Sequence, residues 1–146
     1  LRPDIDAYCP AELVDDVLAE VRSLSGLELV ADSSLAPQSW YYDESLVRMV
    51  LANAVHNALR FARRRIVVSA WQDGDWLAFQ VSDDGPGYPP EMLADPAPSA
   101  PLSAEGVGLG LHLARSVVRL HENHGLTGSL SLANGPGAVL VLRLPR

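Results

Sequence analysis

The feature that most restricts the fold of this chain is a long apolar segment with a polar stripe, SLVRMVLANAVHNALRFA, at residues 45–62. Its apolar residues recur with the period of an α-helix, and Asp43 before it is a good N-cap. The sequence therefore predicts a helix from about Glu44 to Ala62. One side of this helix carries four polar side chains, namely Asn53, His56, Asn57 and Arg60.

Two interpretations of this polar stripe remain open at this point. It is either a face turned to water or the wall of a binding site. Solvent-exposed stripes on helices usually consist of Glu, Lys, Gln and Arg, because Asn is a poor helix former. Two asparagines four residues apart offer carbonyl oxygens, which suit a hard cation such as Mg²⁺.

The rest of the chain alternates helices with pairs of strands. We expect a helix over residues 10–24 and short strands at 27–30 and 39–43. A hairpin follows, with strands at 65–71 and 76–83 joined at Asp73-Gly74, a favoured turn dipeptide. After a proline-rich loop at 88–105, glycines open a last helix that Gly125 closes, and a second hairpin spans 128–134 and 138–144. This order predicts an α+β two-layer sandwich: a mixed, mostly antiparallel sheet with three main helices on one face.

Composition limits the class of function. The 146 residues suit one compact domain over residues 1–146, and the net charge is −7 with no lysine, which argues against a nucleic-acid binder. The Arg63–Arg65 run is read as a helix end, where cations complement the dipole. The single cysteine, Cys9, and the lack of an apolar span or secretory leader predict a cytoplasmic domain without membrane contact. A start without Met suggests a fragment of a longer protein, which could itself be anchored to a membrane.

Two further segments are rich in glycine. VSDDGPG ends a predicted strand and places Asp83 and Asp84 beside glycines, although Asp, Gly and Pro also make ordinary turns. EGVGLGLHLAR opens the last helix, and such a start exposes backbone N–H groups that favour phosphate. It could equally be a hinge without a ligand. It has neither the dinucleotide-binding spacing nor the lysine of a P-loop.

Four features follow one another along the chain: a helix with two asparagines, a strand that ends in Asp-x-Gly-x-Gly, a loop, and a helix that starts with Gly-x-Gly-x-Gly. In this order they resemble the ATP-binding domain of sensor histidine kinases. This is the Bergerat fold, shared with type II topoisomerase, Hsp90 and MutL ATPases. NAVHNALRFA is similar to the family's N box, DDGPG to its first glycine box and GVGLGL to its second. The closing hairpin is similar as well, so the resemblance covers nearly the whole chain.

The resemblance implies roles for the helix residues. Asn57 would supply a side-chain oxygen to the Mg²⁺ that bridges the ATP phosphates, and Arg60 would meet the phosphates. Asn53 and His56 would lie on the same wall and act through water. The hydrolysing branches carry a glutamate where this chain has Asn53, and an amide is no general base near neutral pH. The chain therefore resembles a kinase rather than a hydrolase.

The resemblance also implies roles in the glycine boxes. Asp84 would accept a hydrogen bond from the adenine amino group, and Gly85 and Gly87 would let the backbone pass close to the base. The loop from Tyr88 to Glu105, which has no Arg, Lys or Phe, would be the lid over ATP. The second glycine box would contact the nucleotide through Gly106, Val107, Gly108, Leu109, Gly110 and Leu111.

A histidine kinase also needs partners. The acceptor histidine is expected on a separate dimerisation hairpin that this chain lacks, and a response regulator would receive the phosphoryl group. His121-Glu122 has the form of an acceptor motif, but it lies at the predicted end of a helix. Two alternatives remain open: a serine kinase of the anti-sigma type, or a degenerate module that binds nucleotide or a protein without phosphoryl transfer.

Overall fold

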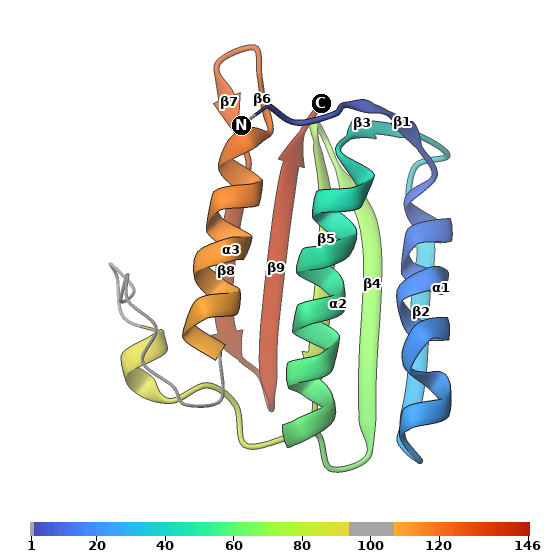
Figure 1. The fold of residues 1–146 in the computed structure, drawn as a ribbon, viewed down its shortest axis with the longest axis vertical. Helices are drawn as coiled ribbons and strands as arrows, with labels where there is room; N and C mark the ends of the chain where they lie inside the picture. Colours follow the sequence, from blue (N-terminus) through green and yellow to red (C-terminus); the bar gives the residue numbers. More distant parts are fainter. Residues whose placement is uncertain (1, 94–106) are drawn as a thin grey trace.

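The computed structural model of the protein describes residues 2–93 and 107–146. Its described α-helices lie side by side on one face of a sheet (Figure 1); they are α1 (Pro10–Val21), α2 (Glu44–Phe61) and α3 (Val107–Leu120). Short 3-10 turns occur at Arg22–Leu24 and Pro90–Met92. None of the helices described here is long and apolar enough to cross a membrane.

The main sheet carries the helices on its inner face. Its strands, in spatial order, are β2 (Glu28–Leu35), β4 (Arg65–Asp73), β5 (Trp76–Asp83), β9 (Ala138–Pro145) and β8 (Ser129–Asn134). β2 and β4 are parallel, and the other pairs are antiparallel. This confirms the predicted α+β sandwich, with a mixed and mostly antiparallel sheet.

The central helix α2 forms as its sequence predicts. The Asp43 carboxylate accepts a hydrogen bond from the Leu46 N–H at 3.0 Å, which satisfies one free donor of the first turn. The apolar side of α2 is buried against the sheet, with Val47, Leu51 and Val55 fully enclosed. Burial of that side, rather than helix propensity, holds α2 in place, because most of the stability of a helix in a protein comes from packing its apolar face.

Two small sheets were not predicted. β1 (Asp6–Tyr8) pairs with β3 (Trp40–Tyr42), so the predicted strand at 39–43 does not join the main sheet. The last helix ends at Leu120 instead of running to Gly125, and a hairpin of β6 (Glu122–Asn123) and β7 (Leu126–Thr127) follows it. His124 and Gly125 both have positive φ, which suits a tight hairpin turn, so Gly125 turns a hairpin instead of closing a helix.

A buried histidine ties α2 to the end of α3. His121 is 4% exposed, and both of its ring nitrogens are engaged. Its Nε2 accepts a hydrogen bond from the Asp43 N–H at 3.0 Å, and its Nδ1 lies 2.9 Å from the Val117 carbonyl oxygen, to which it donates. The same Asp43 carboxylate accepts the Asp4 N–H at 2.7 Å. This junction requires a neutral imidazole, because a protonated Nε2 cannot accept.

Because of this junction, we expect the protein to become less stable as the solution becomes more acidic. Burial lowers the pKa of His121, although the Val117 carbonyl and the Asp43 carboxylate act in the opposite direction. The stabilisation is complete above the unfolded value of about 6.5 and is lost as pH falls from there through the folded pKa. We expect the free energy of unfolding, measured in urea between pH 7.5 and 5, to fall by at most about 1.4 kcal/mol per pH unit from this group.

His121→Gln should flatten that dependence, whereas His56→Gln, a change at an exposed histidine, should leave it as in the wild type. Equal pH slopes in all three proteins would contradict the role given to His121.

Candidate nucleotide-binding site

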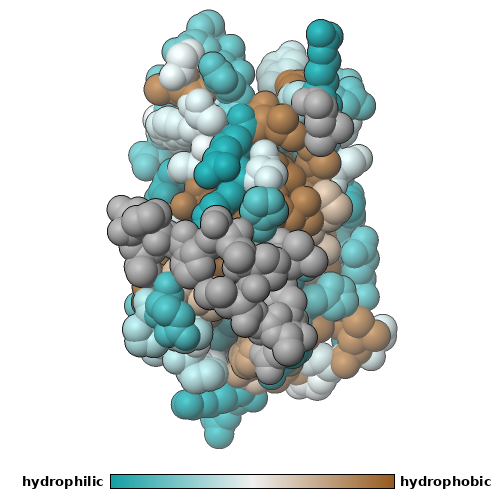
Figure 2. All heavy atoms as spheres, turned by 60° about the vertical axis from the view of Figure 1, so that its left-hand side comes forward, coloured by the Kyte–Doolittle hydropathy of each residue, from teal (hydrophilic) through white to brown (hydrophobic). Residues whose placement is uncertain are grey.

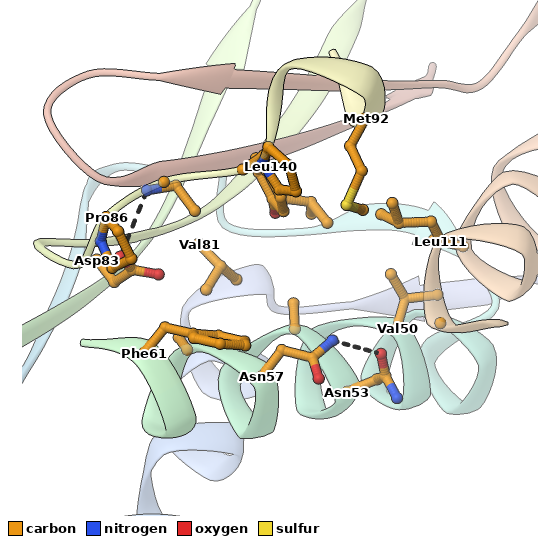
Figure 3. A pocket seen from close by; sticks show the side chains of 18 of the residues that line it. Val50, Asn53, Asn57, Phe61, Val81, Asp83, Pro86, Met92, Leu111 and Leu140 are labelled. Carbon is orange, nitrogen blue, oxygen red and sulfur yellow. Dashed lines mark hydrogen bonds between the residues drawn. The ribbon is translucent and has the colours of Figure 1, made fainter. Parts of the chain in front are cut away.

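A cavity of about 520 Å³ opens between α2, the end of β5, the segment after it and α3 (Figure 3). Its lining is mostly apolar, with a few polar groups, which is typical of a small-molecule site. Figure 2, which brings the α3 side of the molecule forward, shows apolar surface beside the residues drawn in grey. The lining consists of Val50, Asn53, Ala54, Asn57, Ala58, Phe61, Val81, Asp83, Pro86, Gly87, Tyr88, Pro89, Pro90, Met92, Gly110, Leu111, Ala114, Ala138 and Leu140.

Only half of the polar stripe on α2 faces this cavity. Asn53 and Asn57 line it, and the Asn57 Nδ2 donates to the Asn53 Oδ1 at 3.4 Å (Figure 3). His56 and Arg60 are exposed and are not among the lining residues. At about 100° per residue, His56 lies about 60° from Asn53 on the side opposite to Asn57, so the helix turns it away from the cavity.

Arg60 lies only about 20° from Asn53 on α2, toward His56 and away from Asn57. Its guanidinium carbon is 5.5 Å from the ring centroid of Phe61, which does line the cavity. Arg60 thus lies beside a lining residue without lining the cavity itself, and its contact with the phosphates stays a prediction.

The carboxylate that lines the cavity is Asp83, the last residue of β5. Its Oδ1 accepts hydrogen bonds from the Gly85 N–H at 2.8 Å and the Ala138 N–H at 3.3 Å. These two donors fix the carboxyl group at the floor of the cavity, between β5 and the start of β9. Side chains two apart on a strand share a face, so Asp83 follows Val81 toward the helices.

The expected position of Asp84 needs correction, because Asp84 does not line the cavity. Its carboxylate instead accepts the backbone N–H groups of Arg63 at 2.8 Å, Arg64 at 3.0 Å and Arg65 at 3.3 Å. These N–H groups, that of Arg64 above all, hold the pKa of Asp84 below its usual range. Asp84 thus ties the end of β5 to the connection between α2 and β4.

The two glycines after these aspartates have different surroundings. Gly87 lines the cavity with φ +85°, a backbone conformation that favours glycine. Gly85 is buried but is not a lining residue; a Cβ there would collide with the Phe61 carbonyl oxygen. Gly85 therefore allows close approach between the β5 end and α2, rather than approach to a ligand.

The predicted lid is described only at its beginning. Tyr88, the prolines after it and Met92 form one wall of the cavity, with a 3-10 turn at Pro90–Met92. Burial raises the pKa of Tyr88 to about 12, and the negative charge of Asp83 adds to the rise. The Tyr88 hydroxyl is therefore neutral at physiological pH. Residues 94–105 of the predicted lid lie outside the described residues.

The second glycine box reaches the cavity through Gly110 and Leu111. A Cβ on Gly110 would collide with the Asn53 Oδ1, so this glycine lets α3 approach α2 at the cavity. Val107, Gly108 and Leu109 lie in the first turn of α3, and Gly106 lies outside the described residues. Of the members of this box whose side-chain surroundings are described, Gly110 and Leu111 both line the cavity.

The donor set fits a magnesium ion that arrives with phosphates. The described residues contain no group of three His, Cys, Asp or Glu side chains arranged to hold a metal ion. Mg²⁺ bound with a nucleotide needs few protein ligands, because phosphate oxygens and waters complete its octahedral shell. The Asn57 amide offers one such oxygen on the cavity wall.

Comparison with known proteins agrees with this geometry. Residues 42–146 match the family described as histidine kinase-, DNA gyrase B- and HSP90-like ATPases. The chain belongs to this family. Among curated proteins, this ATPase domain is 31% identical over 112 residues to the signal transduction histidine-protein kinase AfsQ2 of Streptomyces coelicolor, covering 71% of this chain and 20% of the relative.

Solved structures show the same fold. The catalytic domain of histidine kinase ThkA has a TM-score of 0.79 at 20% identity and covers 97% of this chain and 95% of that one. Full-length ShkA, solved in complex with AMPPNP, has a TM-score of 0.84 at 22% identity and covers 99% of this chain and 32% of that one. The chain spans between a fifth and a third of the length of the curated relatives that it matches first.

Of the two adjacent aspartates, Asp83 lines the cavity, whereas Asp84, to which the resemblance gave the contact with adenine, does not. The signal that identifies Asp83 is the alternation along β5, where Phe79, Val81 and Asp83 share one face. The cavity roles of Phe61 and Tyr88 were also missed. Phe61 continues the helical face of Asn53 and Asn57, so the period of α2 indicated it. Nothing local in the sequence marks Tyr88.

The contact of Gly110 with Asn53 should reverse the usual effect on stability of replacing a helical glycine by alanine. In a helix, Gly→Ala normally stabilises by about 1 kcal/mol. Here Gly110→Ala should lose most of that gain or destabilise, because Asn53 must leave its rotamer and its bond with Asn57 at about 0.5–1.5 kcal/mol. In an Asn53→Ala background the same change should stabilise fully. A double-mutant cycle in urea measures the difference, and additive effects would contradict the contact.

Proposed function

We propose that this chain is the catalytic, ATP-binding domain of a two-component sensor histidine kinase. It binds Mg·ATP and presents the γ-phosphate to a histidine on the dimerisation domain of the full-length protein. The observation that carries the proposal is one cavity with a fixed carboxylate, Asp83, at one end and an asparagine pair on α2 along its wall. Membership of the ATPase family supports it.

The Asp83 end of the cavity is suited to a purine base. A carboxylate held by two backbone N–H groups keeps its other oxygen for a ligand donor, such as the amino group of adenine. Phe61, Val81 and Leu140 supply apolar surface around it for the faces of the ring. We therefore assign to Asp83 the base-reading role that the sequence analysis gave to Asp84.

The α2 wall is suited to the phosphates and their metal. Asn57 would hold Mg²⁺, which, when bound, neutralises phosphate charge and orients the γ-phosphate. Among the described lining residues the one carboxylate is Asp83, which its backbone partners fix between β5 and β9. Within the part of the chain that the structure describes, no lining carboxylate therefore lies beside the asparagines as a general base to activate water. This favours retention of the γ-phosphate for a protein acceptor over hydrolysis.

The acceptor is proposed to lie on another part of the full-length kinase. His121, the one candidate within an acceptor-like motif, is 4% exposed, and both nitrogens are engaged in hydrogen bonds. It cannot reach a phosphate without breaking the junction between α2 and α3. A response regulator would then receive the phosphoryl group, and the domain would work on the cytoplasmic side, where ATP is available.

The two adjacent aspartates form a matched pair for testing the base contact. Asp83→Asn should weaken Mg·ATP binding by about 10–100-fold in calorimetric titration, because hydrogen bonds to a charged acceptor are worth about 1.5–3 kcal/mol. Asp84→Asn should leave affinity within about threefold but lower the melting temperature, because three backbone N–H groups lose a charged acceptor. The opposite pattern would return the base contact to Asp84.

Asn57 is tested through the magnesium dependence of ATP binding. Wild type should bind ATP at least about tenfold more tightly with Mg²⁺ than in chelator, and Asn57→Ala should lose most of that ratio. Ala is the better helix former, so α2 should stay intact. His56→Ala, on the outer side of the same helix, is the control and should keep the ratio. If Asn57→Ala retains the wild-type ratio, Asn57 is not a metal ligand.

A further inference from the structure

An exposed residue outside the asparagine and glycine boxes holds one wall of the cavity. Asn134 is the last residue of β8, 46 positions from the wall residue it contacts. Its Oδ1 accepts the Tyr88 N–H at 2.8 Å, and its Nδ2 donates to the Tyr88 carbonyl oxygen at 3.1 Å. The side-chain amide therefore pairs with both backbone groups of Tyr88, as a neighbouring strand would.

The wall depends unusually strongly on this contact. Pro86, Pro89 and Pro90 have no backbone N–H, so the wall has few groups with which to bond to the rest of the protein. Between Gly87 and Leu93, all described hydrogen bonds to another element run to Asn134; the others, from the Met92 and Leu93 N–H groups, stay within the wall.

Gly87 is shaped to this contact as well. A Cβ on Gly87 would lie 2.7 Å from the Asn134 Cγ and Oδ1 and 2.9 Å from its Nδ2, closer than side chains pack. The positive φ of Gly87 turns the chain so that Tyr88 presents both backbone groups to the amide.

The same hairpin also holds the base-reading carboxylate. The Ala138 N–H, just after the β8–β9 turn, donates to Asp83, and a Cβ on Gly137 would collide with the Asp83 carbonyl oxygen. One turn thus fixes Asp83 through Ala138 and the opposite wall through Asn134. The hairpin therefore contacts both the carboxylate and the wall of the cavity.

We infer that Asn134 is a positioning residue for nucleotide binding: it holds the Pro86–Met92 wall against the base and so slows nucleotide release. That the ligand is a nucleotide rests on the proposed function. The pair of hydrogen bonds between Asn134 and Tyr88, called the clamp below, does not depend on that function. Asn134 does not line the cavity, so it acts through Tyr88 and not on the nucleotide.

The test compares Asn134→Ala with Asn123→Ala. Asn123 is an exposed asparagine on β6 whose Nδ2 donates to the Arg146 carbonyl oxygen at 2.6 Å, so the same kind of bond is removed away from the cavity. In nucleotide-free protein, the Tyr88 amide should exchange with solvent at least about tenfold faster in Asn134→Ala, and as in wild type in Asn123→Ala. Equal Tyr88 exchange in wild type and Asn134→Ala would overturn the clamp.

Stopped-flow kinetics with a fluorescent methylanthraniloyl-ATP and Mg²⁺ form the second arm. Asn134→Ala should raise the dissociation rate about tenfold and leave the association rate within about threefold, because two hydrogen bonds order the bound wall. If nucleotide dissociates from Asn134→Ala at the same rate as from the wild type, the inference is overturned while the proposed function stands. A wild type that binds no nucleotide would overturn the proposed function and the nucleotide part of this inference, and the exchange arm would still decide the clamp.

Discussion

Two consecutive carboxylates at the end of β5 point in opposite directions, and the site depends on that division. Asp83 continues the inward face of the strand and is fixed by the Gly85 and Ala138 N–H groups. Asp84 turns outward and accepts three N–H groups of the α2–β4 connection. A single strand end therefore supplies both the charge inside the cavity and the tie that holds the far end of α2.

Glycines let the elements around the cavity approach one another closely at two points. α3 approaches α2 where Gly110 faces Asn53, and β5 approaches α2 where Gly85 faces the Phe61 backbone. A larger residue in place of Gly85 would meet the Phe61 backbone, and one in place of Gly110 would displace the Asn53 side chain that lines the cavity. Glycine in this chain thus serves close packing between elements at least as much as contact with a ligand.

Much of the fold followed from the sequence because its signals are local. The cap at Asp43 and the helical period placed α2 correctly to within a residue, and the Asp73-Gly74 turn placed the β4–β5 hairpin. The errors arose where distant contacts decide. The three residues of β1 form a strand only because they pair with β3. The helix α3 ends just before His121, whose ring accepts a hydrogen bond from the distant Asp43 N–H.

The site was predictable in its motifs but not in its details. Helical spacing grouped four polar residues on α2, but it could not show that the cavity lies to one side of Asn53, which takes in Asn57 and leaves out His56. Two adjacent aspartates look alike in a motif, and only strand alternation separates them. The Asn134 contact with Tyr88 joins the end of β8 to the segment after β5, and nothing in either segment of the sequence indicates the other.

The most direct measurement is a crystal structure of this domain with Mg²⁺ and a non-hydrolysable ATP analogue. The account predicts the purine amino group within hydrogen-bonding distance of the Asp83 carboxylate and the metal about 2.1 Å from the Asn57 Oδ1. A base seated on Asp84, or a metal held away from α2, would contradict it.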